Sequence, residues 1–177
     1  SANRGISQDG TTTATIGNVT LTGATTNQSG VYTSALITAN NIVITGTASA
    51  TVVSGWIVQV NALTINSAAT GGDITITATG AAAGGGNGIY QSGNITGANG
   101  SDITFTSNNK ISQNGAITLA ANTSGNTATL LYDTTSGNSS STISGYPVTL
   151  TAGSTSDINF VMKSAGSAIN PGAIGTS

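Results

Sequence analysis

The stretch Asp102-Ile103-Thr104-Phe105-Thr106 alternates strictly between polar and apolar side chains. A period of two is the pattern of a half-buried β-strand, with aliphatic residues on one face and threonine on the other. No stretch of the chain shows the 3.6-residue period of an amphipathic helix. Related copies occur at Asn18–Thr22, Asn41–Thr45, Ala62–Asn66, Asp73–Thr77, Ala116–Leu119, Pro147–Thr151 and Asp157–Val161. The sequence therefore predicts an all-β protein.

A second motif, in which glycine leads a short apolar segment, recurs between these strands. It begins as Gly5-Ile6-Ser7-Gln8 and continues, later without the glycine, to Leu130-Leu131-Tyr132-Asp133. The apolar second positions are Ile6, Val31, Trp56, Ile89, Ile111 and Leu131, which are 25, 25, 33, 22 and 20 residues apart. A third short strand is expected in some repeats, as at Ala35–Thr38.

Repeats of this length, with two or three short strands each, cannot bury their apolar faces alone, but stacked repeats bury a continuous column. We expect one domain, residues 1–177, folded as a right-handed parallel β-helix (β-solenoid) of about six to seven coils and roughly 30 Å in length. The segment Thr79–Gly86, which lengthens one repeat, is expected to be a loop at a corner. A β-sandwich is the alternative architecture, since it also contains many short strands.

Composition argues against catalysis and against several classes of partner. Charged residues make up 5% of the chain, and His, Cys and Glu are absent. We expect neither an enzyme nor a cofactor, since the glycine-rich stretches also lack the calcium-binding and phosphate-binding patterns. Three basic residues are too few to neutralise a nucleic-acid backbone, and no apolar run approaches the roughly 18 residues of a membrane span.

The lack of cysteine fits either a reducing cytosol or an exported bacterial protein, and the composition favours the second. No signal peptide is visible at Ser1, so the sequence is expected to be a mature or excised segment. We expect an extracellular or cell-surface location.

The stretches Gly88–Thr96 and Gly100–Thr106 resemble the repeats of filamentous-haemagglutinin-like exoproteins and autotransporter passengers of Gram-negative bacteria. The resemblance is one of repeat style and covers most of the chain. It implies a right-handed β-helix, export through an outer-membrane transporter, and a role in adhesion or biofilm formation. The partner would be a protein or a glycan on a cell surface.

The five aspartates are the only carboxylate side chains that could serve a polysaccharide-cleaving β-helix. Asp73, Asp102 and Asp157 open strands where Asn18 and Asn41 stand in other repeats. That exchange is typical of residues that cap turns, so we expect these carboxylates to be structural.

Threonines on the polar face predict outward ladders, and ladders of this kind make an ice-binding solenoid the main alternative function. The array is interrupted at Val43, Asn66, Ala120, Asn159 and Val161, and the repeat length varies. Thr is also a good exposed β-former. The candidate residues of the ladder are Thr20, Thr22, Thr75, Thr77, Thr104, Thr106, Thr149 and Thr151.

Three tyrosines occupy the same place in the glycine-led motif. Tyr32, Tyr90 and Tyr132 would therefore line one edge of the solenoid, either as a stripe that contacts a sugar or as the cover of a corner. Phe105 and Phe160 take apolar strand positions and are expected in the core.

A solenoid has unpaired strand edges at its first and last coils, and such edges must be capped, continued or paired. The sequence therefore predicts either a slice of a longer adhesin or a filament subunit that assembles with itself, end to end or side by side.

Overall fold

A computed structural model gives the fold. It describes residues 4–26, 28–50, 55–66, 71–81, 87–123, 125–137, 143–144, 147–153, 156–166, 169–170 and 174–176. These residues form twenty β-strands, and no helix occurs among them. The all-β prediction is confirmed.

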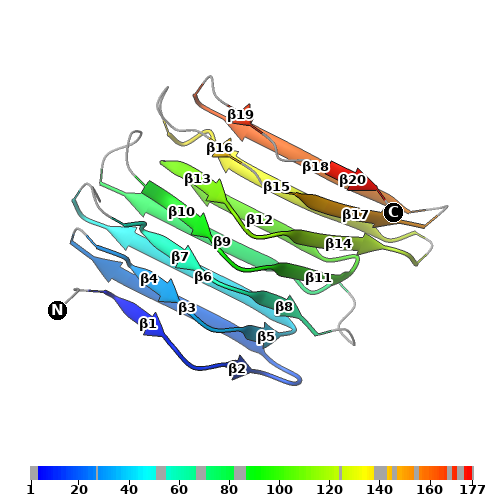
Figure 1. Ribbon diagram of the computed structural model, residues 1–177, viewed down its shortest axis with the longest axis horizontal. Helices are drawn as coiled ribbons and strands as arrows, with labels where there is room; N and C mark the ends of the chain where they lie inside the picture. Colours follow the sequence, from blue (N-terminus) through cyan, green and yellow to red (C-terminus); the bar gives the residue numbers. More distant parts are fainter. Residues whose placement is uncertain are drawn as a thin grey trace.

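The strands form three parallel sheets, and every third strand along the chain enters the same sheet (Figure 1). Sheet A contains β1 (Ile6–Gln8), β4 (Val31–Thr33), β7 (Val58–Val60), β10 (Asn87–Gln91), β13 (Lys110–Gln113), β16 (Ile143–Ser144) and β19 (Ile169–Asn170). Sheet B contains β2 (Thr12–Thr13), β5 (Ile37–Ala39), β8 (Leu63–Ile65), β11 (Ile95–Asn99), β14 (Ile117–Ala121), β17 (Val148–Ala152) and β20 (Ile174–Thr176). Sheet C contains β3 (Asn18–Thr25), β6 (Asn41–Ala48), β9 (Ile74–Gly80), β12 (Asp102–Ser107), β15 (Thr127–Thr134) and β18 (Asp157–Ser164).

Three consecutive strands, one from each sheet, make a coil, and successive coils stack in chain order from β1 to β20 (Figure 1). This is a β-solenoid, as predicted. The β-sandwich alternative is wrong, because neighbouring strands in all three sheets run parallel, whereas sandwich sheets are antiparallel.

The core is built from columns of aliphatic side chains that stack from coil to coil. In sheet C, the cross-strand register places one inward residue of each strand opposite the next. One such column is Leu21, Ile44, Ile76, Phe105, Tyr132 and Met162. Its four middle members are fully buried, whereas Leu21 and Met162, in the first and last strands of the sheet, are only partly buried. Burial of such side chains is worth about 1.5–3 kcal/mol each.

The corners on both sides of sheet C vary in length, while the strands keep their register. β12 ends at Ser107 and β13 begins at Lys110, but β6 ends at Ala48 and β7 begins only at Val58. Within the expected loop Thr79–Gly86, Thr79 and Gly80 complete β9, and residues 82–86 lie outside the described residues. Differences in repeat length therefore do not disturb the stacking of sheet C.

Gly46 lies where sheet C approaches sheet A of the following coil. A Cβ atom at this position would lie 2.4 Å from Val58 Cγ2 and 2.9 Å from the Ile57 carbonyl oxygen. Glycine is therefore required by the close approach of the two strands rather than by its own backbone conformation.

Two alignments of the glycine-led motif are wrong. Val31 pairs with Val58 and not with Trp56, so the motif slips by two residues in that repeat. The segment Leu130–Asp133 belongs to sheet C, where Leu130 pairs with Ile103. The continuation of sheet A is Ile143, which pairs with Ile111.

The threonine-rich strands fall into two classes. Those that begin with Asn or Asp lie in sheet C, whereas those led by Ala or Pro lie in sheet B, at Leu63, Ile117 and Val148. The sequence motif was predicted as one class because period-2 alternation is the same in both sheets.

Candidate functional site

The outer face of sheet C carries a regular array of hydroxyl groups on its first four strands. Outward positions alternate with inward ones along β3, β6, β9 and β12, and the inward residues are fully buried on β6, β9 and β12 and partly buried on β3. One column is threonine throughout, and the neighbouring column is interrupted once, by Val43. We call these eight positions the threonine array: Thr22, Thr45, Thr77 and Thr106 in the first column, and Thr20, Val43, Thr75 and Thr104 in the second.

The strand pairings place Thr20, Thr22, Thr75, Thr77, Thr104 and Thr106 of the predicted ladder on one face of sheet C. Thr149 and Thr151 do not belong to it, because β17 lies in sheet B. The interruptions expected at Asn159 and Val161 lie on β18, beyond the array, and those at Asn66 and Ala120 lie elsewhere than sheet C.

Sheet B carries a longer but narrower ladder. Its pairings place six threonines in single file, one on each of six successive strands. The members are Thr13, Thr38, Thr64, Thr96, Thr118 and Thr149. Thr13, Thr38 and Thr96 were missed by the sequence analysis, because β2 and β5 are only two and three residues long and Gly97 breaks the alternation of β11 after Thr96.

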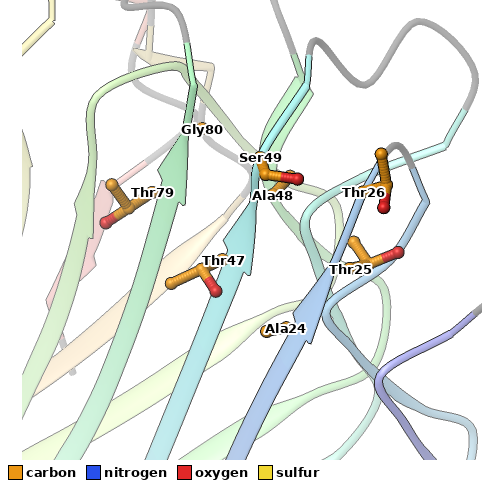
Figure 2. A pocket seen from close by; sticks show the side chains of 8 residues that line it. All are labelled: Ala24, Thr25, Thr26, Thr47, Ala48, Ser49, Thr79 and Gly80. Carbon is orange, nitrogen blue, oxygen red and sulfur yellow. The ribbon is translucent and has the colours of Figure 1, made fainter.

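Two shallow hollows adjoin these faces. The first, about 440 Å³, lies where β3, β6 and β9 end, next to Thr47 and Thr79 (Figure 2). Thr47 and Thr79 are opposite each other and, with Ala24, add a third short column to the array. The second hollow, about 470 Å³, lies on sheet B beside Thr64 and Thr96. Both hollows are lined by small neutral side chains, and neither contains an ionisable group among its lining residues.

The outer face of sheet A carries the partly exposed aromatic rings. Tyr32 and Tyr90 lie in one column with Gln59 between them. The Arg4 guanidinium lies 3.7 Å from the centre of the Tyr32 ring, and Tyr90 stacks on Trp56 at 5.3 Å. Each of these two tyrosine rings therefore already has one face in contact with a side chain of the same chain.

Tyr132 is a correction to the predicted tyrosine stripe. It lies on β15, in sheet C, and is completely buried. Its ring stacks on Phe105, with centroids 4.9 Å apart and an interplanar angle of 3°, and meets the edge of Phe160 at 6.1 Å. Its hydroxyl donates a hydrogen bond of 2.6 Å to Gln113 Oε1, and burial raises the pKa of this phenol well above its ordinary value. Tyr132 is therefore a core residue that cannot contact a surface partner.

Asn and Asp side chains form a ladder along the edge of sheet C where the strands begin. Asn41 Nδ2 donates to Asn18 Oδ1 at 2.8 Å, and Asn41 Oδ1 accepts the Asp73 N–H at 2.9 Å. Asp73 Oδ1 accepts the Asp102 N–H at 3.1 Å. The carboxylate of Asp73 thus satisfies backbone groups, as predicted for a capping residue. Asp157 departs from this pattern. It pairs with Thr127, whereas Asp102 pairs with Thr129, so the two aspartates lie in different columns.

Asp133 lies on β15, in the same column as the first threonine column, and faces Lys163 of β18. Desolvation by burial acts to raise the pKa of its carboxyl. Hydrogen bonds from the Thr135 hydroxyl and N–H, together with the charge of Lys163, outweigh this effect and hold the pKa below its ordinary value. This is a local charge pair, typical of a solvated strand end.

Within the described residues, no three His, Cys, Asp or Glu side chains lie close enough to share a metal ion. In the same part of the chain, no helix is long and apolar enough to cross a membrane.

In comparisons with known proteins, the chain matches no family model, no curated protein and no solved structure.

Proposed function

We propose that this chain is a structural, non-enzymatic segment of a bacterial adhesin or extracellular filament. The observation that carries the proposal is the uninterrupted stacking of parallel strands around one apolar column, from β1 to β20. Such a solenoid gains length by adding coils, because each coil contacts only its neighbours. The proposal includes the six to seven coils that the sequence repeat predicts. It also includes right-handed winding, because connections between parallel strands are generally right-handed.

The two ends of the stack support continuation by further coils. Val19 and Leu21 in the first coil, and Ile158, Phe160 and Met162 on β18, are only partly buried, although their equivalents in the middle of sheet C are fully buried. The outer edges of β3 and β18 each lack a neighbour in the described part of sheet C. Another coil placed on either end would cover the apolar residues and pair the edge. That coil belongs either to the same polypeptide or to a second copy.

The location follows from composition. A chain with 5% charged residues and no cysteine suits export in an unfolded state through an outer-membrane transporter, followed by folding outside a Gram-negative cell. Its partners would be a protein or a glycan on a cell surface, or other copies of itself.

The test is the mass of the native polypeptide, together with electron microscopy of the same material and surface labelling of intact cells. A native chain far heavier than 17.1 kDa, labelled on the cell surface, supports a segment of a large adhesin. A 17.1 kDa chain found in filaments supports a subunit that assembles with itself. A 17.1 kDa chain that stays monomeric inside the cell would contradict the proposal, as would release of oligosaccharides from a polysaccharide by the purified chain.

A further inference from the structure

The threonine array is a two-dimensional lattice and not only a row of polar residues. β3, β6, β9 and β12 pair residue by residue along both columns of the array, without a bulge. Neighbouring strands lie about 4.8 Å apart, and alternate residues of one strand about 6.6 Å apart. Seven of its eight positions present a hydroxyl and a methyl group at these fixed repeats.

The lattice is also rigid. Each outward threonine sits between inward residues that are fully buried on three of the four strands, so the backbone beneath the array is held by the core. Threonine is branched at Cβ, which restricts its first side-chain torsion. Hydroxyl positions are therefore largely set before any partner binds, and little side-chain entropy is lost on binding.

The charge and the hydrogen-bonding groups of the array indicate which kind of surface it can bind. All eight positions are uncharged, so the array does not suit a mineral surface, nucleic acid or charged polymer. Flat polysaccharides are generally bound by exposed aromatic rings, and the aromatic rings of the described residues lie on sheet A or in the core. The partner that remains is one with a neutral, periodic surface that forms hydrogen bonds at fixed repeats. Ice has such a surface.

We propose that the outer face of β3, β6, β9 and β12 binds ice. The threonine hydroxyls occupy positions of water oxygens at the ice surface. The methyl groups between them form no hydrogen bonds, so water at the interface can bond only to the hydroxyls. The objection that repeat length varies does not apply to this face, because the variation lies in the corners outside sheet C. The inference is independent of the proposed structural role.

The face has clear limits on the same sheet. Beyond β12 the two columns continue as Leu131 and Val161 in one, and Asp133 and Lys163 in the other. Charged and bulky side chains interrupt both repeats there. The ladder on sheet B is a single file, so it provides repeats in one direction only.

The experiment measures thermal hysteresis of the purified chain and its partition into a slowly growing ice hemisphere. The disruptive variant is Thr77→Tyr, at the middle of the array, where a large ring keeps ice away from the neighbouring threonines. Thr118→Tyr is the matched control, because it makes the same change on the outer face of sheet B. The wild-type chain and Thr118→Tyr are expected to show hysteresis and to enter the ice, and Thr77→Tyr is expected to lose most of both. Circular dichroism should show that all three chains fold alike.

A gain-of-function variant tests the same idea without disruption. Val43→Thr completes the second column by an exchange of similar shape, and is expected to increase the hysteresis at equal protein concentration. Absence of hysteresis and of partition in the wild-type chain would overturn the inference, as would equal losses in Thr77→Tyr and Thr118→Tyr. Binding of the wild-type chain to crystalline cellulose or chitin, with no effect on ice, would overturn it in favour of a polysaccharide surface. None of these results changes the chain mass or filament formation that test the structural role.

Discussion

The first four strands of sheet C differ from the last two on both faces. On β3, β6, β9 and β12 the outer residues repeat threonine, and the inner column is aliphatic until Phe105. In the same two columns, β15 and β18 carry Leu131 and Val161, and Asp133 and Lys163, while the core there contains the aromatic contacts of Tyr132. Yet β15 pairs with β18 over all eight residues of each strand, without a register shift. The solenoid therefore does not require threonine in these two columns, and the threonine array of the first four strands exceeds what folding demands.

The largest expected effect comes from the aromatic core of the last strands. Tyr132→Ala removes the stacking on Phe105 and leaves a large cavity, so we expect it to lower the free energy of unfolding by about 3–5 kcal/mol. Ile76→Ala, the equivalent change two strands earlier in the same column, should cost about 2–5 kcal/mol and less than Tyr132→Ala. Urea unfolding of the two variants measures the difference. A greater loss for Ile76→Ala would show that the aromatic contacts add nothing to the stability of this end.

Removal of the Tyr132 hydroxyl alone should have a smaller effect. In Tyr132→Phe the ring contacts remain but Gln113 Oε1 loses its phenolic donor. We expect a cost of about 1 kcal/mol, measured in the same urea series. If Tyr132→Phe lowered the free energy of unfolding as much as Tyr132→Ala, the ring contacts would not be the main contribution of Tyr132 to stability.

A second sensitive position in the early strands is a glycine. Gly46→Ala forces a Cβ atom against Val58 and the Ile57 carbonyl group, and overpacking of this kind costs about 1–3 kcal/mol. Gly10→Ala is the control, since a Cβ atom there meets nothing within 4 Å. Thermal unfolding monitored by circular dichroism should separate the two variants. Equal melting temperatures would show that the corner accommodates the added methyl group without a loss of stability.

The smallest effect concerns the charge pair on the last strands. Because the folded state holds the pKa of Asp133 below its ordinary value, this carboxylate stabilises the fold above the unfolded pKa of about 3.9. The contribution is lost as the pH falls through the lower folded pKa. For so exposed a group we expect a few tenths of a kcal/mol, seen as a loss of wild-type stability below about pH 4. Asp133→Asn should remove this component and leave the remaining pH dependence unchanged.

The sequence predicts the strands better than it predicts their sheets. Period-2 alternation identified the strands around Thr20, Thr75 and Thr104 and their outward threonines, because alternation is a local property. The assignment of Thr149 to the same ladder failed because a period of two is identical in sheets B and C. The leading residue does not separate the two classes either: Asn and Asp lead into sheet C, where they bond the next strand, but Asn94 leads into β11 of sheet B and also accepts a hydrogen bond from the next coil.

Tyr132 shows the second limit of the sequence. Its neighbours Leu130 and Leu131 are both apolar, so the local pattern does not decide which of the two faces the core. Only the register with Phe105, set 27 residues earlier in the chain, places Tyr132 inside. The threonine ladder of sheet B was hidden for a similar reason, because strands such as β2 and β5 are two or three residues long.

The direction of the hydrogen bonds has a mechanical consequence. In all three sheets the inter-strand bonds point along the stacking direction of the coils. A pulling force applied to the two ends of the stack therefore loads successive coil–coil interfaces in series, and the ladders of the three sheets share the force at each interface. Extension should then proceed by detachment of one coil at a time, beginning at the weakest interface, with a separate force peak for each. A tether built in this way dissipates work in small steps, and every detached coil leaves its neighbour as a template on which it can re-form when the load falls.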